Sequence, residues 1–177
     1  MALLSDIGHD SVYYFLTDMV CLSIRPGEKS VSLITPYDPQ NIFAQIIRGD
    51  APCYKLYEDD DVLAFLDLFP QSFGHTLVIP KRSAACNILD VDTEALGKVM
   101  AVVQKLTRAI VDELQPDGVQ VAQFNGAPAG QTVFHIHVHI VPRYAGEGLG
   151  IHAAGKAEPE ALEKLQTRLV QRLAQRA

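Results

Sequence analysis

The sequence has few cysteines, no excess of basic residues and no long hydrophobic run. Its three cysteines, Cys21, Cys53 and Cys86, are odd in number, widely spaced and form no CxxC pair. That pattern argues against a disulfide framework and favours free thiols in the reducing cytoplasm. The formal net charge is −6, so the chain lacks the positive field of a protein that binds nucleic acid or an anionic membrane. An anionic ligand would therefore need a local binding site.

No hydrophobic stretch suggests a transmembrane helix or a signal peptide. The apolar run over residues 11–24 carries Asp18 in its middle and is shorter than the roughly 20 residues that span a bilayer. The first basic residue, Arg25, follows this run, whereas a signal peptide has basic residues before it. We expect neither a membrane span nor a cleaved leader.

The length of 177 residues and the 48% hydrophobic content fit one globular domain with a sizeable core. Turns at residues 25–28 and 36–39 mark residues 1–39 as an extension that is partly ordered at best. We expect the main domain over residues 40–155 and a separate amphipathic helix over residues 156–177.

Within the main domain the pattern predicts an alternation of strands and two helices. A short helix begins at Asn41, which can cap it, and a long helix covers residues 93–114. The apolar positions of the long helix are expected to form one buried stripe: Leu96, Val99, Met100, Val103, Leu106 and Ile110. Strands are expected near residues 54–57, 62–68, 75–79, 119–124 and 131–143.

The last of these strands contains the most informative pattern in the chain. Histidine alternates with apolar residues at His135, His137 and His139, and alternation is typical of a half-buried strand. Successive strand side chains point to opposite faces, so the three imidazoles should share one face, roughly 6–7 Å apart. Such a row can hold a metal, or it can handle phosphate with one ring as the nucleophile. Three aligned histidines are improbable as simple core residues, although one alone would not be.

Three further features gain weight beside the histidines. Asp67 interrupts an otherwise apolar strand, where an unpaired buried carboxylate would be costly, and His75 begins the next strand. The loop over residues 125–130 contains two glycines and can present backbone amides to a phosphate. Lys81 and Arg82 are more simply read as solvated surface residues.

In these residues the chain resembles the histidine triad (HIT) nucleotide-binding proteins, and the Hint-like bacterial branch of that family in particular. The resemblance rests on two blocks, residues 131–140 with the HφHφHφφ pattern and residues 41–81, and covers about residues 41–155. It implies an α+β fold with a five-stranded antiparallel sheet, one long helix and one or more short ones. It also implies a homodimer and a purine nucleotide ligand.

The resemblance also assigns roles by position. His137 matches the nucleophile that takes the nucleotidyl group from the α-phosphate, His135 and His139 match its partners, and His75 matches a fourth histidine of the pocket. Asp67 matches the acid that binds the ribose hydroxyls. The positions that match the apolar walls around the base are Phe43, Ile46 and Phe65. Those that match the phosphate side are Asn125, Gly130 and Thr132.

In one respect the sequence departs from some bacterial relatives, which carry a CxxC near the short helix that helps to bind a structural zinc. Residues 41–44 read Asn-Ile-Phe-Ala here, so we predict no metal and no cofactor. The histidine at position 139, where the transferase branch has glutamine, favours hydrolysis.

The predicted activity is a cytoplasmic nucleoside phosphoramidase, in which neutral His137 attacks the α-phosphorus and water releases the nucleotide. A dinucleoside polyphosphate hydrolase would need the same site with a larger leaving group. Two other classes stay open: a non-catalytic nucleotide sensor that acts through a partner, and a zinc enzyme that uses the three histidines.

Overall fold

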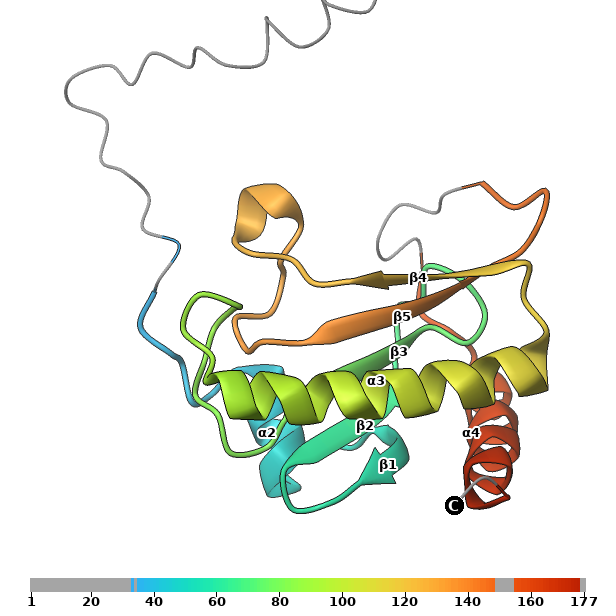
Figure 1. Ribbon diagram of the computed structural model, residues 1–177, viewed down its shortest axis with the longest axis horizontal. Coiled ribbons are helices and arrows are strands. Elements are labelled where there is room, and N and C mark those ends of the chain that lie inside the picture. The colour runs from blue at the N-terminus through green and yellow to red at the C-terminus, as the bar shows by residue number, and fades with distance from the viewer. Residues whose placement is uncertain (1–32, 34, 149–154, 176–177) are drawn as a thin grey trace, which may run out of the picture. The chain divides into compact units, whose positions relative to one another are not determined.

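The computed structural model describes residue 33, residues 35–148 and residues 155–175, all within the unit Leu33–Ala177. The extension expected before residue 33 lies outside the described residues. Figure 1 shows a sheet with helices packed around it. In chain order the elements are α2 (Ile42–Arg48), β1 (Tyr54–Glu58), β2 (Val62–Leu66), β3 (Thr76–Pro80), α3 (Thr93–Leu114), β4 (Gly118–Ala122), the 3-10 turn η1 (Ala127–Ala129), β5 (Val138–Arg143) and α4 (Pro159–Ala174).

The five strands form one sheet in the order β1-β2-β3-β5-β4, and every neighbouring pair is antiparallel. This confirms the α+β fold with a five-stranded antiparallel sheet. The strands begin and end within a few residues of their predicted bounds, except the last. β5 starts only at Val138, so the expected strand over residues 131–143 is wrong in its first half.

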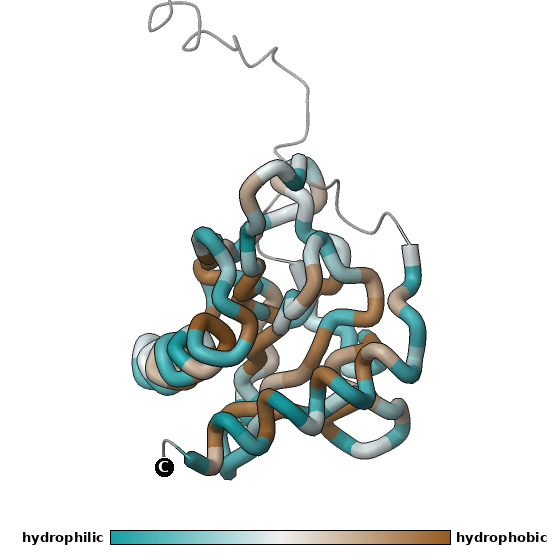
Figure 2. Tube along the Cα trace, turned by 90° about the vertical axis from the view of Figure 1, so that its right-hand side faces the viewer, coloured by the Kyte–Doolittle hydropathy of each residue, from teal (hydrophilic) through white to brown (hydrophobic). Residues whose placement is uncertain are grey.

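The two faces of the sheet carry separate hydrophobic clusters. On one face Leu66, Val78 and Ile140 pack against α3 and α4, and Figure 1 shows α3 lying across the strands. On the other face Phe65, Leu77 and Ile79 pack against Phe43 of α2. Figure 2 shows hydrophobic segments toward the middle of the domain, with hydrophilic residues recurring along its outer turns. Both faces of the sheet are therefore covered, one by two long helices and the other by a short one.

The helix caps follow from local sequence. The side chain of Asn41 accepts a hydrogen bond from the Ala44 amide at 3.0 Å, and α2 ends at Gly49, whose φ of 84° suits a residue without a Cβ. Asp92 caps α3 by accepting from the amides of Glu94 and Ala95. Asp90, the other cap candidate, instead accepts from amides of the preceding loop.

The helix periodicities are mostly confirmed. In α4 the leucine stripe is buried against the sheet, which stabilises the fold by roughly 1.5–3 kcal/mol for each side chain; it consists of Leu162, Leu165, Leu169 and Leu173. In α3 the prediction for Met100 is wrong: its side chain is 43% exposed, and Val102 lies on the buried side in its place. None of the described helices combines the length and apolar character needed to cross a membrane.

Candidate active site

The strand register places the first site residues on the sheet face away from α3. Phe65 pairs with Leu77 across β2 and β3, and Leu77 pairs with His139 across β3 and β5. Directly opposed residues point to the same face, so these three side chains form a row across the sheet. Asp67 and His75, just outside β2 and β3, lie on the same side.

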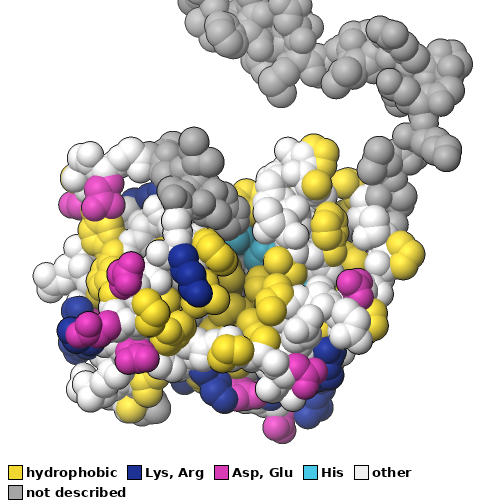
Figure 3. Space-filling model, turned by 180° about the vertical axis from the view of Figure 1, so that it is seen from behind, with side chains coloured by type: hydrophobic (Ala, Val, Ile, Leu, Met, Phe, Trp, Pro, Cys, Tyr) yellow, Lys and Arg dark blue, Asp and Glu magenta, His cyan; other side chains and the backbone are white. Residues whose placement is uncertain are grey.

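This face carries a pocket of about 340 Å³. Figure 3, seen from the side opposite Figure 1, shows histidine at the centre of the face with hydrophobic side chains around it. The expected site residues that line the pocket are Phe43, Ile46, Phe65, Asp67, Thr132, His137 and His139. The sequence reading missed the other lining residues: Ile42, Pro52, Cys53, Leu66, Leu68, Phe69, Leu77 and Val133. A run of apolar residues gives no signal that distinguishes a pocket wall from a core.

The three histidines form a row of rings, although only His139 lies in a strand. The ring of His137 lies 4.8 Å from that of His139 and 5.0 Å from that of Phe43, between centroids. Phe43 also contacts His135 edge-on at 6.3 Å. The segment before β5 leaves the sheet because its backbone groups have other partners: the Ile136 amide donates to the Ala85 carbonyl.

His135, at one end of the row, is fixed by two hydrogen bonds. Its Nε2 lies 3.0 Å from the Pro80 carbonyl, which can only accept, so Nε2 carries the proton. Its Nδ1 lies 2.6 Å from the hydroxyl of Tyr37. Burial, reinforced by the charge that His137 can carry, lowers the pKa of His135 from 6.5 to about 4, although the Pro80 carbonyl opposes the shift. At neutral pH His135 is therefore uncharged, in a single tautomer.

His137, the middle ring, has the geometry of an imidazole nucleophile. Its Nδ1 lies 2.7 Å from the carbonyl of His135, so Nδ1 holds the proton. With one proton on the ring, the lone pair is then on Nε2, and the side chain lines the pocket.

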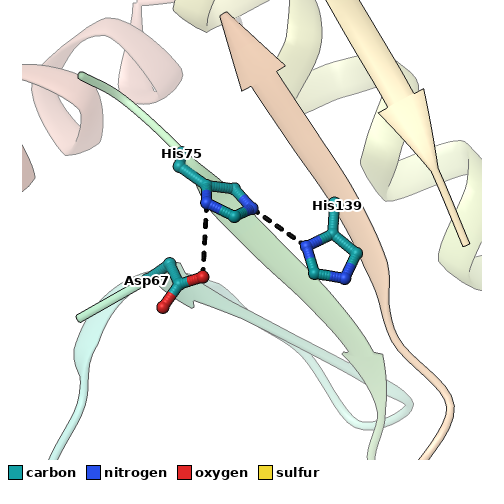
Figure 4. A group of neighbouring side chains, drawn as sticks. All are labelled: Asp67, His75 and His139. Carbon is teal, nitrogen blue, oxygen red and sulfur yellow. Dashed lines mark hydrogen bonds and ion pairs between the residues drawn. The ribbon is translucent and has the colours of Figure 1, made fainter. Parts of the chain in front are cut away.

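The other end of the row continues from His139 into a chain of polar groups (Figure 4). His139 Nδ1 lies 2.9 Å from His75 Nε2, and His75 Nδ1 lies 3.2 Å from a carboxylate oxygen of Asp67. The other carboxylate oxygen of Asp67 accepts from the Phe69 amide at 2.9 Å. Asp67 is only 8% exposed, so it is a partnered acid at the pocket and not a strand-end residue in water.

His75 Nδ1 has a second neighbour, the backbone amide of Gln71 at 3.2 Å. The two neighbours make opposite demands, because a carboxylate accepts a proton and an amide donates one. If Nδ1 donates to Asp67, His139 Nδ1 donates to His75 and His139 Nε2 is bare. If Nδ1 accepts from Gln71, His75 Nε2 donates to His139, and His139 Nε2 then carries a proton.

The loop over residues 125–130, which was expected on the phosphate side and is called the phosphate-side loop, is held together internally. The amides of Gly126, Ala129 and Gly130 all donate to acceptors between residues 126 and 131. The side-chain oxygen of Asn125 accepts from the Ile88 amide at 3.0 Å. Neither Asn125 nor Gly130 lines the pocket, and their phosphate contacts stay predictions. Thr132 does line it.

Gln131 organises this loop and was not singled out by its sequence. It is buried, accepts from the Gly126 amide at 2.8 Å, and donates to the carbonyls of Cys86 and Val133 at 2.6 and 3.0 Å. Its position shortly before the three histidines was the feature of the sequence that could have indicated this role.

The walls of the pocket are apolar, and no Lys or Arg is among its lining residues in the described part of the chain. Phe43 and Phe65 meet edge to face, 5.6 Å between ring centroids. Burial raises the pKa of the Cys53 thiol in this wall, which keeps the thiol neutral at physiological pH. The pocket can therefore hold a flat apolar part of a ligand by shape and van der Waals contact. Its polar atoms lie at the histidine end.

Metal ligation does not fit these side chains as they stand. Asp67, His75 and His139 offer ligand atoms within 4.8 Å of one another. Tetrahedral zinc, with Zn–N distances of about 2.0–2.1 Å, would however spread two ligand nitrogens to about 3.4 Å, and those of His75 and His139 are 2.9 Å apart and hydrogen-bonded. At the position of the relatives' CxxC, Asn41 caps a helix and Ala44 is buried.

Comparisons with known proteins agree with the geometry. A family profile described as HIT domain matches residues 48–146. Protein hit of Bacillus subtilis is 44% identical over 138 residues, which cover 75% of this chain and 94% of that protein. Adenylylsulfatase HINT3 of Arabidopsis thaliana is 39% identical over 126 residues, covering 68% and 63%.

Solved structures give the same result. The crystal structure of a Hit-like protein from Bartonella henselae has a TM-score of 0.74 and 45% identity, and covers 78% of this chain and 99% of that chain. A hypothetical histidine triad nucleotide-binding protein from Sulfolobus tokodaii has a TM-score of 0.69 and 34% identity, covering 75% and 91%.

Proposed function

The chain belongs to the histidine triad family, and on that premise we propose that it hydrolyses purine nucleotides at the α-phosphate through a nucleotidyl-His137 intermediate. The preferred substrate class is a nucleoside phosphoramidate, in which an amine is bonded to the phosphorus of AMP or GMP. The observation that carries the proposal is the hydrogen bond from His137 Nδ1 to the His135 carbonyl. It leaves Nε2 as the attacking atom in the pocket.

In the first step His137 Nε2 bonds to the α-phosphorus and the phosphorus–nitrogen bond breaks. The electron pair goes to the leaving amine, which takes a proton from His139 Nε2. The donating form is the one in which His75 donates to both Asp67 and His139, so that the pair carries one extra proton and both rings are neutral after the transfer. The His137 ring becomes a nucleotidyl-imidazolium, because Nδ1 keeps its proton. The His135 carbonyl stabilises that positive charge.

In the second step water attacks the phosphorus and the bond to Nε2 breaks. A proton of the water goes to His139 Nε2, and His137 recovers its neutral form as the nucleotide leaves. Each turnover converts one phosphoramidate and one water into a nucleoside monophosphate and an amine. The ring leaves as neutral imidazole, which is a good leaving group and suits this step.

The lining of the pocket supports a substrate with one phosphate. A polyphosphate chain carries several charges, and cationic side chains are the usual partners of such groups; the described lining has none. This disfavours a dinucleoside polyphosphate hydrolase. The relative named adenylylsulfatase makes adenylyl sulfate a useful second probe, because its leaving group needs no proton.

The test is turnover of an adenosine phosphoramidate by the wild type and by His137→Ala. We expect the variant to lose at least about 10³-fold in kcat, since the nucleophile is removed, while AMP binding measured by calorimetry persists. Intact-mass spectrometry of quenched wild type should show an adenylyl adduct that His137→Ala lacks.

Near-normal turnover by the variant would refute the mechanism. AMP binding by a wild type that neither turns over nor forms an adduct would favour the non-catalytic sensor. The homodimer implied by the family is part of the proposal too, and sedimentation equilibrium tests it.

A further inference from the structure

The segment that enters the domain, Leu33 with residues 35–39, is attached to the loops that support the catalytic histidines. The Leu33 carbonyl accepts from the side-chain amide of Asn87 at 2.7 Å. Thr35 and the buried Cys86 thiol make two reciprocal sulfur contacts, at 3.4 and 3.6 Å. The segment therefore lies against residues 86–87, and Gln131 joins the carbonyl of Cys86 to the phosphate-side loop.

Tyr37 is the member of this segment that reaches the histidines. Its hydroxyl lies 2.6 Å from His135 Nδ1, and the two rings are tilted by 59° with centroids 5.6 Å apart. Because His135 Nε2–H is committed to the Pro80 carbonyl, Nδ1 is the lone-pair nitrogen and the hydroxyl is the donor. Both ring nitrogens of a side chain that is 1% exposed are thus satisfied.

The backbone of His135 then transmits this constraint to the nucleophile. The carbonyl of His135 is the acceptor that holds the proton on His137 Nδ1, at 2.7 Å. Because its ring is anchored at both nitrogens, His135 resists a shift of its backbone. Such a shift would displace the carbonyl, and His137 Nδ1 would lose the partner that fixes its tautomer. Two hydrogen bonds, of 2.6 and 2.7 Å, thus connect the Tyr37 hydroxyl to His137 Nδ1 through the covalent frame of His135.

We propose that Tyr37 is a positioning residue for the nucleophile, which acts through His135 to hold His137 in the tautomer and orientation that present Nε2 to the phosphorus. The proposal rests on the proposed function for its catalytic consequence, but the imidazole geometry that it describes does not. Tyr37 does not line the nucleotide pocket. Its loss should therefore change kcat and leave substrate binding unchanged.

The experiment uses Tyr37→Phe in the full chain, which removes the hydroxyl and keeps the half-buried ring. The matched control is Tyr57→Phe in β1, which removes a hydroxyl that donates to Asp59 at 2.7 Å and does not line the pocket. For an adenosine phosphoramidate we expect Tyr37→Phe to lower kcat by about 10- to 100-fold, with KM within about twofold, because misplacement by about an ångström has effects of that order. Tyr57→Phe should stay within about twofold of the wild type.

Imidazole ¹⁵N NMR provides a readout that does not need turnover. In the wild type His135 should show the pure Nε2–H tautomer and His137 the pure Nδ1–H tautomer. In Tyr37→Phe the His137 resonances should move toward a mixture of tautomers, whereas Tyr57→Phe should leave them unchanged.

Unchanged kcat together with unchanged His137 resonances in Tyr37→Phe would overturn the positioning role. A change in KM alone, or an equal loss in the control variant, would overturn it as well. A wild type without turnover would defeat the proposed function, and the NMR comparison would then decide the role of Tyr37 by itself.

Discussion

The two ends of the histidine row differ in how many hydrogen-bond arrangements they allow. At the His135 end, a carbonyl that only accepts and a hydroxyl that donates define one tautomer. At the His139 end, His75 Nδ1 lies 3.2 Å from both an acceptor, Asp67, and a donor, the Gln71 amide. The first end is fixed, and the second has two arrangements that differ in whether His139 Nε2 carries a proton.

This difference matches the two demands of the proposed reaction. A nucleophile needs one defined lone pair, which a rigid partner supplies. A group that gives a proton to the leaving amine and takes one from water must be stable in both protonation states. A single row of histidines thus provides both properties, because its two ends are built on different neighbours.

The largest expected effect comes from replacing His139, at the end of the row that allows two hydrogen-bond arrangements. His139→Asn keeps a polar group but cannot exchange a proton with His75 in the same way. We expect kcat for an alkylamine phosphoramidate to fall by about 10²–10⁴-fold, the usual contribution of general acid–base catalysis. Adenylyl sulfate, whose leaving group needs no proton, should lose far less in the first step, the transfer of the nucleotidyl group to His137. Single-turnover kinetics on both substrates measures the contrast.

His75→Asn is the companion variant, because it leaves His139 in place and removes its proton partner. It should show the same leaving-group contrast at a smaller size. Equal losses on both substrates in both variants would mean that this end only binds the phosphate.

Periodicity was sufficient to place most of the helices and strands, since burial on one face repeats every two residues in strands and about every 3.6 in helices. The five-stranded antiparallel sheet was implied by the family resemblance. The alternation was wrong about where β5 begins. The Ile136 amide donates to the Ala85 carbonyl and not to a neighbouring strand, and β5 begins only at Val138. The rings still lie in a row, because contacts with Phe43 and the loops position His135 and His137 where the sheet does not.

The candidate site could be predicted from a recognisable spacing for the three histidines and from the family resemblance for residues such as Asp67 and His75, but not for contacts outside those patterns. His135, His137 and His139 follow one another along the chain, whereas the contact between Tyr37 and His135 joins residues 98 positions apart. A single tyrosine in a segment without periodicity gives no local signal of such a contact. Met100 failed for a different reason: an apolar residue fits the helical stripe by its type, and only packing shows that Val102 faces the core.

The fixed end predicts a pH-dependent stability. The pKa of His135 is about 4 in the folded chain and about 6.5 when unfolded, so between these values the unfolded chain binds more protons. The stability from this group is therefore fully present above about pH 6.5 and is lost as pH falls toward 4. The total is about 3 kcal/mol, and about 2 kcal/mol of it should be gone by pH 5.

Urea unfolding of the wild type and of His135→Gln between pH 7.5 and pH 5 measures this contribution, because the glutamine does not titrate. The wild type should lose about 2 kcal/mol more than the variant over that range. Parallel losses in the two proteins would place the His135 pKa near its ordinary value and remove the contrast between the two ends.

The smallest expected effect compares two glycines, one beside His75 and one in the phosphate-side loop. Gly74, next to His75, has φ 93°, and an added Cβ would lie 2.5 Å from Leu114 Cδ1 and 3.1 Å from Pro142 Cγ. Gly126, in the phosphate-side loop, has φ 86°, and an added Cβ would lie 2.8 Å from the end of the exposed Leu33 side chain.

An alanine has a similar backbone cost at both positions, but the ring of Pro142 beside Gly74 cannot move aside as the Leu33 side chain can. We expect Gly74→Ala to be about 1–2 kcal/mol less stable than Gly126→Ala in urea unfolding, and to show the leaving-group contrast of His75→Asn because its own strain falls on His75. If the two variants were equally stable and equally active, the side chains around Gly74 would adjust to an added Cβ as easily as those around Gly126. The tight packing beside His75 would then have no effect on the His139 end of the row.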